Sequence, residues 1–171
     1  MSASGRVRSL YIVRHAIAAE RGPDWPDDSK RPLTHKGTAR MRQAVAGLGR
    51  LGVTIDTVLT SPYTRAAETA QLLVDGLSPA PSLSVTSALE PGQPFDAVLR
   101  ALAPFARTDA VALVGHEPDL GELAGKLIGA AAPVAFKKGG VCRLEYVRLP
   151  PRGVARLVWH ATPKMLRALG K

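Results

Sequence analysis

Short apolar runs alternate with segments of helical periodicity along most of the chain. The runs are rich in β-branched and apolar residues, a pattern typical of strands that are buried in a sheet. Thr34 is a candidate helix N-cap, and an apolar stripe from Met41 to Leu48 follows it at helical spacing. The predicted strands are 9–13, 57–60, 83–86, 110–114, 141–149 and 154–161. One predicted helix begins at 33–34, and three others cover 63–73, 95–105 and 119–128.

The segments between these elements are typical of loops. Residues 21–32 are polar and Pro-rich without periodicity, and long loops of this kind are frequently functional. Shorter connections are expected at 78–81, 90–94 and 150–153, the last joining two paired strands. The alternation of strands and helices predicts an α/β fold with three layers, α/β/α, and a mostly parallel central sheet. No repeat or second-domain boundary is visible, so we expect a single domain over residues 1–171.

Composition narrows the class of protein. The chain has 171 residues, of which 46% are hydrophobic, which excludes intrinsic disorder. No apolar run is long enough to cross a bilayer, and no apolar segment typical of a signal peptide precedes the first strand. The single cysteine, Cys142, cannot form an internal disulfide, which suits a reducing compartment. We therefore expect a cytoplasmic protein without membrane contact.

The charge is distributed unevenly along the chain. The net charge is +9, yet residues 1–136 hold 14 basic and 13 acidic residues. Residues 137–171 hold nine basic residues against Glu145 alone. Such a region can attract nucleic acid, anionic lipid or an acidic partner. Because aromatic side chains for base stacking are few and scattered, nucleic-acid binding is not favoured, and an anionic substrate explains the charge equally well.

The most reactive residues follow the predicted strands directly. Arg14-His15 ends the first strand, Arg65 follows the second, and His116 follows the strand at 110–114. In open α/β sheets, ligands bind beyond the carboxyl ends of the strands. The planar guanidinium group of arginine can donate two parallel hydrogen bonds to phosphate oxygens, and a neutral imidazole can attack phosphorus. No carboxylate cluster suggests Mg²⁺, so the arginines would neutralise the phosphoryl charge. The pattern predicts metal-free phosphoryl transfer.

Four segments, in order, resemble motifs of the histidine phosphatase superfamily, whose founding members are the phosphoglycerate mutases. The segments are Arg14-His15-Ala16, Arg31-Pro32-Leu33-Thr34-His35-Lys36-Gly37, Ser61-Pro62-Tyr63-Thr64-Arg65-Ala66-Ala67-Glu68-Thr69-Ala70 and Val114-Gly115-His116-Glu117-Pro118. The similarity covers nearly the whole chain. Within the superfamily the chain most resembles the compact SixA-type phosphohistidine phosphatases, which lack the cap insertions of larger members.

The resemblance implies a fold, an activity and a role for each motif residue. The fold would be phosphoglycerate mutase-like without a cap domain. His15 would attack phosphorus and carry a phosphohistidine intermediate, while Arg14, Arg65 and His116 would hold the phosphoryl oxygens. The implied reaction needs neither metal nor cofactor. The implied substrate is a phosphorylated histidine-containing protein or a small phosphorylated metabolite.

The chain departs from the superfamily pattern at three places. Ala16 replaces the usual glycine and would be strained if the turn there needs a positive φ. Ala18 and Arg21 stand where many members have a hydroxyl residue and an asparagine; Arg21 could supply an extra cation for substrate binding. Glu90 is the nearest candidate for a general acid, although Ala88 could occupy that position. A weak or absent acid would favour a P–N substrate, because its leaving nitrogen accepts a proton readily.

Several alternatives remain open. The first is a small-molecule phosphatase for nucleotide or sugar phosphates, and the second is a non-catalytic phosphate- or nucleic-acid-binding module built on the basic C-terminal third. A mutase is less favoured, because retaining the phosphoryl group calls for an enclosed site. Cys142 and Arg148 have the spacing of cysteine-dependent phosphatases, but the residues between them lack the required glycines. Asp24, Asp27 and Asp28 are expected in a solvated loop, and Lys137 and Lys138 could border the phosphate pocket.

Overall fold

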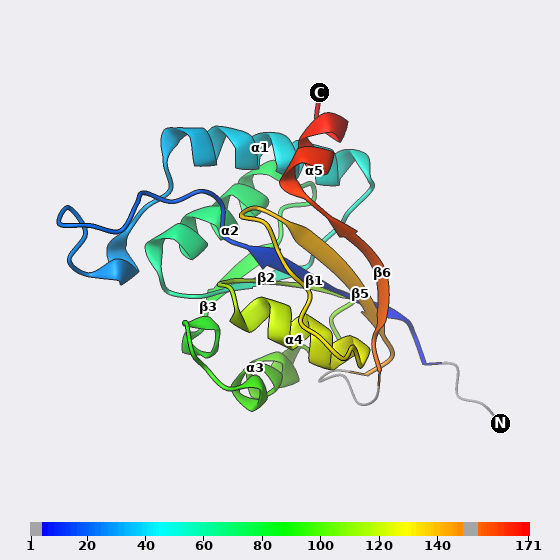
Figure 1. Cartoon of the computed structure of the whole chain (residues 1–171). Coiled ribbons are helices and arrows are strands. Elements are labelled where there is room, and N and C mark those ends of the chain that lie inside the picture. The colour runs from blue at the N-terminus through cyan, green and yellow to red at the C-terminus, as the bar shows by residue number, and fades with distance from the viewer. Residues whose placement is uncertain (1–4, 149–153) are drawn as a thin grey trace.

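The computed structural model describes residues 5–148 and 154–171, which form one six-stranded sheet covered by helices on both faces (Figure 1). The strand order is β3-β2-β4-β1-β5-β6; the first four strands are parallel, β5 runs antiparallel to β1, and β6 runs antiparallel to β5. The strands are β1 Arg8–Arg14, β2 Thr57–Thr60, β3 Ser82–Val85, β4 Ala110–Gly115, β5 Val141–Tyr146 and β6 Arg156–Ala161. The α-helices are α1 His35–Arg50, α2 Thr64–Gly76, α3 Phe95–Leu102, α4 Asp119–Ile128 and α5 Pro163–Leu169, and short 3₁₀ turns are η1 Asp28–Lys30, η2 Ser87–Leu89 and η3 Ala103–Phe105.

The sheet separates two apolar cores. Side chains alternate along a strand, so Tyr11 and Val13 of β1 pack with α1, α2 and α5, while Leu10 and Ile12 pack with α3 and α4 on the opposite face. Figure 1 shows the same division of the helices. The predicted three-layer α/β/α architecture with a mostly parallel sheet is therefore confirmed. No helix among the described residues has the length and hydropathy of a membrane span.

The register of the central strands brings their ends together. Arg14 at the end of β1 lies opposite Gly115 at the end of β4, so the residues that follow them, His15 and His116, leave the sheet side by side. On the other side of β4, the end of β2 is followed by Ser61, whose amide donates to the carbonyl of Val114. The crevice expected from the sequence thus forms above three adjacent parallel strands.

The sequence prediction missed one helix and misplaced the end of another. Helix α5 follows directly after β6; its seven residues are too few to show a periodicity, although Thr162 caps it and Pro163 occupies its first turn. The helix predicted at 95–105 ends at Leu102 and continues as a 3₁₀ turn, because Pro104 has no amide proton for the α-helical pattern. The strand predicted at 141–149 ends at Tyr146, and Val147 and Arg148 form an exposed bend. The predicted turn at 150–153 lies outside the described residues.

Helix α5 packs so closely on α1 that a glycine is required at the contact. A Cβ added to Gly47 would overlap the carbonyl oxygen of Leu166, whereas a Cβ added to Gly49 would meet no atom within 4 Å. We expect Gly47→Ala to lower the free energy of unfolding by about 1–3 kcal/mol, as overpacking usually does. The matched control Gly49→Ala should raise it by about 0.5–1 kcal/mol, because alanine is the better helix former. Urea unfolding of both variants measures this; equal effects would contradict the packing.

Candidate active site

A polar cleft of about 370 Å³ opens at the carboxyl ends of β1, β2 and β4. Its walls include all four residues singled out at the strand ends, Arg14, His15, Arg65 and His116. Arg14 and His15 come from the end of β1, Arg65 from the first turn of α2, and His116 from the loop after β4. Residues separated by about a hundred positions in the sequence are therefore neighbours in one crevice.

The imidazole of His15 is held in one tautomer. Its Nδ1 lies 2.8 Å from the carbonyl oxygen of Ala16, and because a carbonyl only accepts, Nδ1 must carry the proton. The neutral ring then has its lone pair on Nε2, the atom that can attack phosphorus. Burial lowers the pKa of His15 to about 4, and the nearby positive charges of Arg65 and Arg14 act in the same direction. The ring is therefore neutral and nucleophilic at pH 7.

The backbone at Ala16 is not strained. None of the described non-glycine residues has a positive φ, so the turn after His15 does not need a glycine. The amide of Ala16 donates to Oγ1 of Thr69 at 3.0 Å, which ties this turn to α2. Alanine in place of the usual glycine is thus compatible with a relaxed backbone.

His116 lies beside His15, with ring centroids 5.2 Å apart. Its Nε2 is 2.9 Å from Oγ of Ser61, which in turn accepts a hydrogen bond from the amide of Tyr63. Burial, together with the nearby His15 and Arg65, lowers the pKa of His116 to about 3. The Nδ1 atom is buried and has no hydrogen-bond partner among the described residues.

The two arginines form hydrogen bonds through their terminal Nη atoms, while their Nε atoms have no partner among the described residues. Arg14 donates from Nη1 to the carbonyl of Phe136 at 2.7 Å. Arg65, only 3% exposed, donates from Nη1 and Nη2 to the backbone oxygen and Oδ2 of Asp28 at 2.8 and 3.0 Å. Both Nε atoms are buried without a partner among the described residues. Buried polar atoms are nearly always paired in proteins, so the two arginine Nε atoms and Nδ1 of His116 are unsatisfied atoms in residues that line this cleft.

Asp28 anchors an arginine cluster that the sequence did not predict. Besides Arg65, its carboxylate pairs with Nε of Arg31 at 3.0 Å and Nε of Arg21 at 3.2 Å. Partial burial of Asp28 tends to raise the pKa of this carboxyl, but Arg65 and Arg31 outweigh it and hold the pKa below its ordinary value. Of the three aspartates expected in a solvated loop, Asp28 thus has a specific role. Its only sequence signal is its place three residues before the Arg31 motif.

Arg21 and Lys138 border the cleft, as expected for additional cations. The side chain of Arg21 is 79% exposed and reaches the site through Asp28. Lys138 lines the cleft and lowers the pKa of His15, whereas Lys137 does not line it. Arg31, buried and also in the cleft wall, was not among the predicted site residues.

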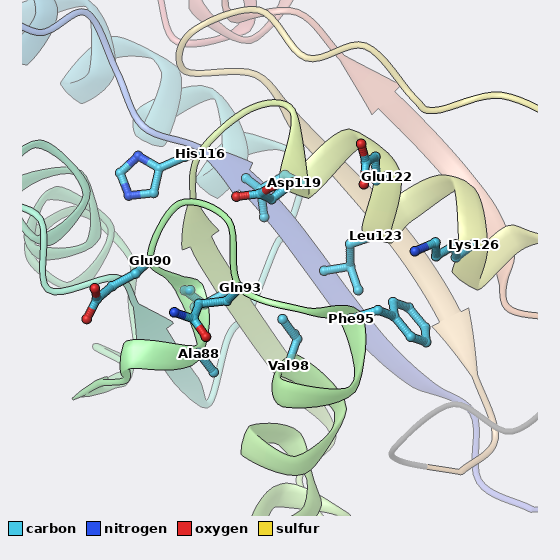
Figure 2. Close-up of a pocket in the computed structure, with 12 residues that line it drawn as sticks. Ala88, Glu90, Gln93, Phe95, Val98, His116, Asp119, Glu122, Leu123 and Lys126 are labelled. Carbon is cyan, nitrogen blue, oxygen red and sulfur yellow. The ribbon is translucent and has the colours of Figure 1, made fainter.

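Two carboxylates lie near His116. Glu90 and Ala88 line a smaller groove beside the main cleft; in Figure 2, Glu90 and His116 are at one end of this groove and Phe95 and Lys126 at the other. Glu117 lines the main cleft itself, and its Oε1 is buried without a partner among the described residues. Burial raises the pKa of Glu117, and the charge of Arg14 opposes that rise. Sequence reasoning missed Glu117, although it follows His116 directly.

Cys142 does not contribute to this chemistry. It lies fully buried in β5 within the core that β1 shares with α3 and α4. Burial raises the pKa of its thiol to about 12, so it is not a thiolate at neutral pH. The alternative of a cysteine-dependent phosphatase is therefore excluded by the surroundings of the thiol.

The two buried histidines should make stability sensitive to mild acid. In the unfolded chain a histidine binds a proton near pH 6.5, but in the folded protein the pKa values of His15 and His116 are about 4 and 3. Between pH 7 and 5 only the unfolded state gains these protons, so the free energy of unfolding falls as pH falls, by about 2 kcal/mol per histidine. Urea unfolding of wild type and His15→Gln at both pH values measures this. A variant with undiminished pH dependence would contradict the burial of a neutral His15.

A buried neutral imidazole with a free Nε2, set among arginine donors, defines a site for phosphoryl groups. Comparison with known proteins places this site in a family. The histidine phosphatase superfamily (branch 1) matches residues 10–90 of the chain. An uncharacterised protein of Picosynechococcus sp. is 43% identical over 156 residues, covering 88% of this chain and 89% of that protein. The phosphohistidine phosphatase SixA of Escherichia coli is 29% identical, covering 94% of this chain and 99% of that protein.

The fold leads to the same family. The structure of the protein histidine phosphatase SixA complexed with tungstate superimposes with a TM-score of 0.80 at 26% identity, covering 91% of this chain and 97% of that one. The chain belongs to the histidine phosphatase superfamily, and it is similar to SixA over more than nine-tenths of its length. Its fold is phosphoglycerate mutase-like, its class of activity is that of a phosphatase, and the described residues contain no cap domain.

Proposed function

We propose that the chain removes the phosphoryl group from a phosphohistidine on a phosphotransfer protein, through a covalent intermediate on His15. The observation that carries the proposal is the set of three buried, unpaired nitrogens, from Arg14, Arg65 and His116, in the cleft that holds His15. A phosphoryl group bound there would satisfy donors that otherwise remain unpaired at a cost in stability.

The proposed reaction has two displacements at phosphorus. First, Nε2 of His15 attacks phosphorus and forms a P–N bond, while the P–N bond of the substrate breaks and its electron pair goes to the leaving imidazole, which takes up a proton. Then water attacks phosphorus, the bond to Nε2 breaks, and inorganic phosphate leaves. The hydrogen bond from Nδ1 of His15 to the carbonyl of Ala16 favours the positive charge that the ring gains during phosphorylation.

The placement of Glu90, the general acid expected from the sequence, supports a P–N substrate over an ester; Glu117 lines the main cleft and is the other carboxyl to compare with it. An alkoxide leaving group needs a proton donor aimed at it, and Glu90 lies in the smaller groove beside His116 rather than in the wall of the main cleft. An imidazole nitrogen accepts a proton readily and needs less help. The similarity to SixA of Escherichia coli, named a phosphohistidine phosphatase, supports the same substrate class.

A small phosphorylated metabolite is the second candidate substrate. The cleft of about 370 Å³ is within the size range of small-molecule sites, roughly 300–1,000 Å³. Such a substrate would use the same anion pocket, and its leaving group would determine whether Glu90 is needed.

The test compares P–N and P–O hydrolysis without added metal. Phosphate release is measured from a phosphohistidine protein, free phosphohistidine and p-nitrophenyl phosphate, for wild type and Glu90→Gln. We expect turnover of both P–N substrates to exceed that of the ester and to be nearly unchanged in Glu90→Gln. Efficient hydrolysis of the ester alone, with a large loss in Glu90→Gln, would overturn the phosphohistidine assignment in favour of a small phosphate ester.

A further inference from the structure

The net positive charge of the protein is concentrated in three segments of the chain. Residues 35–50, 137–140 and 163–171 contain nine basic residues and no aspartate or glutamate. The chain has 23 basic and 14 acidic residues, so outside these segments 14 basic residues balance 14 acidic ones. The excess of +9 is therefore carried entirely by α1, α5 and the segment that leads into β5. We call this the α1–α5 surface.

The α1–α5 surface adjoins the active-site cleft. Helices α1 and α5 pack on each other and on the same side of the sheet (Figure 1). Between them and residues 138–139 lies a cavity of about 60 Å³ whose walls include Arg40, Lys138, Arg167 and Ala16. Lys138 lines this cavity and also the main cleft, and Ala16 follows His15 directly. A protein whose phosphohistidine reaches His15 would therefore lie next to this surface, whereas a small phosphorylated molecule would fit within the cleft.

The cations around this cavity are not neutralised within the molecule. Arg40, Lys138 and Arg167 take part in no ion pair among residues 5–148 and 154–171. Some exposed arginines elsewhere are paired, such as Arg6, which lies 2.6 Å from the carboxylate of Asp109. Arg100 on the opposite side of the sheet is exposed and also has no ion pair among the described residues, but it stands apart from this cluster. Concentrating unpaired charge of one sign attracts an oppositely charged partner and raises its rate of encounter.

We infer that the α1–α5 surface docks an acidic face of the protein that carries the phosphohistidine. The inference rests on the proposed function, because a protein substrate must cover the rim of the cleft to bring its histidine to His15. A nucleic acid fits this surface less well, since residues 35–50, 137–140 and 163–171 contain no Phe, Tyr or Trp on which bases could stack.

The test reverses two charges that are outside the phosphoryl pocket. Arg40→Glu/Arg167→Glu is compared with Arg100→Glu, an exposed arginine of α3 on the opposite side of the sheet. The substrates are a histidine-containing phosphotransfer protein with acidic side chains around its phosphohistidine, and free phosphohistidine. We expect kcat/KM for the phosphoprotein to fall by about tenfold in the double variant, mainly through KM, because steering acts on encounter. Arg100→Glu on either substrate, and all variants on free phosphohistidine, should stay within about twofold.

Ionic strength provides a second readout. Raising salt should lower kcat/KM of wild type for the phosphoprotein and have little effect on the double variant, since exposed charges are screened by ions. Equal kinetics of the two variants on the phosphoprotein, or an equal loss on both substrates, would overturn the docking surface while leaving the proposed function intact. If wild type hydrolyses neither the phosphoprotein nor free phosphohistidine, the proposed function is overturned and the inference with it. Unchanged phosphoprotein kinetics together with charge-dependent binding of a DNA duplex would assign the surface to nucleic acid.

Discussion

Replacement of His15 by alanine is expected to lower kcat by at least about 10⁴-fold, as removal of a covalent nucleophile does. The imidazole of His15 is buried and neutral in the cleft. Because Nδ1 donates its proton in a hydrogen bond to the carbonyl of Ala16, Nε2 is the nucleophilic atom. Arg14, Arg65 and His116 would remain in the variant, so substrate binding should weaken far less than turnover. Phosphate release under saturating substrate measures the effect.

Trapping of the phosphoenzyme makes this prediction specific. Wild type quenched during turnover should carry a phosphoryl group that is stable in base and released in acid, as expected of a P–N bond, and His15→Ala should carry none. His35→Ala is the matched control, because His35 lies exposed at the start of α1, outside the cleft wall. Phosphate on the His15→Ala variant, or turnover equal to that of the control, would show that another residue is the nucleophile.

The second large effect is expected at Arg65. Arg65→Lys keeps the positive charge but cannot donate at once to Asp28 and, through Nε, to a phosphoryl oxygen. We expect kcat/KM to fall by about 10²–10³-fold, the usual effect of losing one donor to a transition-state oxygen. The measurement is steady-state hydrolysis of free phosphohistidine, which does not depend on docking of a protein.

Asp28→Asn separates direct binding by Arg65 from positioning by the loop. The amide of asparagine keeps the shape of the Asp28 side chain but removes the negative charge that forms ion pairs with Arg65, Arg31 and Arg21. If Arg65 contacts the phosphoryl group, Arg65→Lys should reduce kcat/KM more than Asp28→Asn, and urea unfolding should show that both variants remain folded. A loss in Asp28→Asn as large as that in Arg65→Lys would mean that Arg65 mainly holds the loop in place.

The parts of the site that the sequence predicted follow from short-range patterns. Strands β1, β2 and β4 are buried on both faces, so each reads as a continuous run of apolar and β-branched residues. Because parallel strands place their carboxyl ends at one edge, the reactive residues after these runs could be assigned to a common crevice. The structure brings Arg14, His15, Arg65 and His116 together there.

The parts that the sequence did not predict depend on contacts between distant residues. Helix α5 is seven residues long, and its stability comes from packing on α1 rather than from a visible periodicity. Asp28 is 37 positions from Arg65, and nothing in the loop sequence distinguishes it from Asp27 as the partner of that arginine. The burial of Glu117 likewise follows from its surroundings in the fold and not from its neighbours in the chain.

The sequence by itself thus determined the fold class, the strand-end residues and the family, because these are written in local hydrophobic patterns and in motif order. Only the tertiary structure decided the state in which those residues act. It directed the Nδ1 proton of His15 to the carbonyl of Ala16 in a hydrogen bond and lowered the pKa of both histidines by burial. It joined Arg21, Arg31 and Arg65 through Asp28. It also gathered basic residues from both ends of the chain into one surface beside the cleft. Desolvation, tautomer and charge pairing depend on which atoms meet across the fold, and that is set by packing of the whole chain.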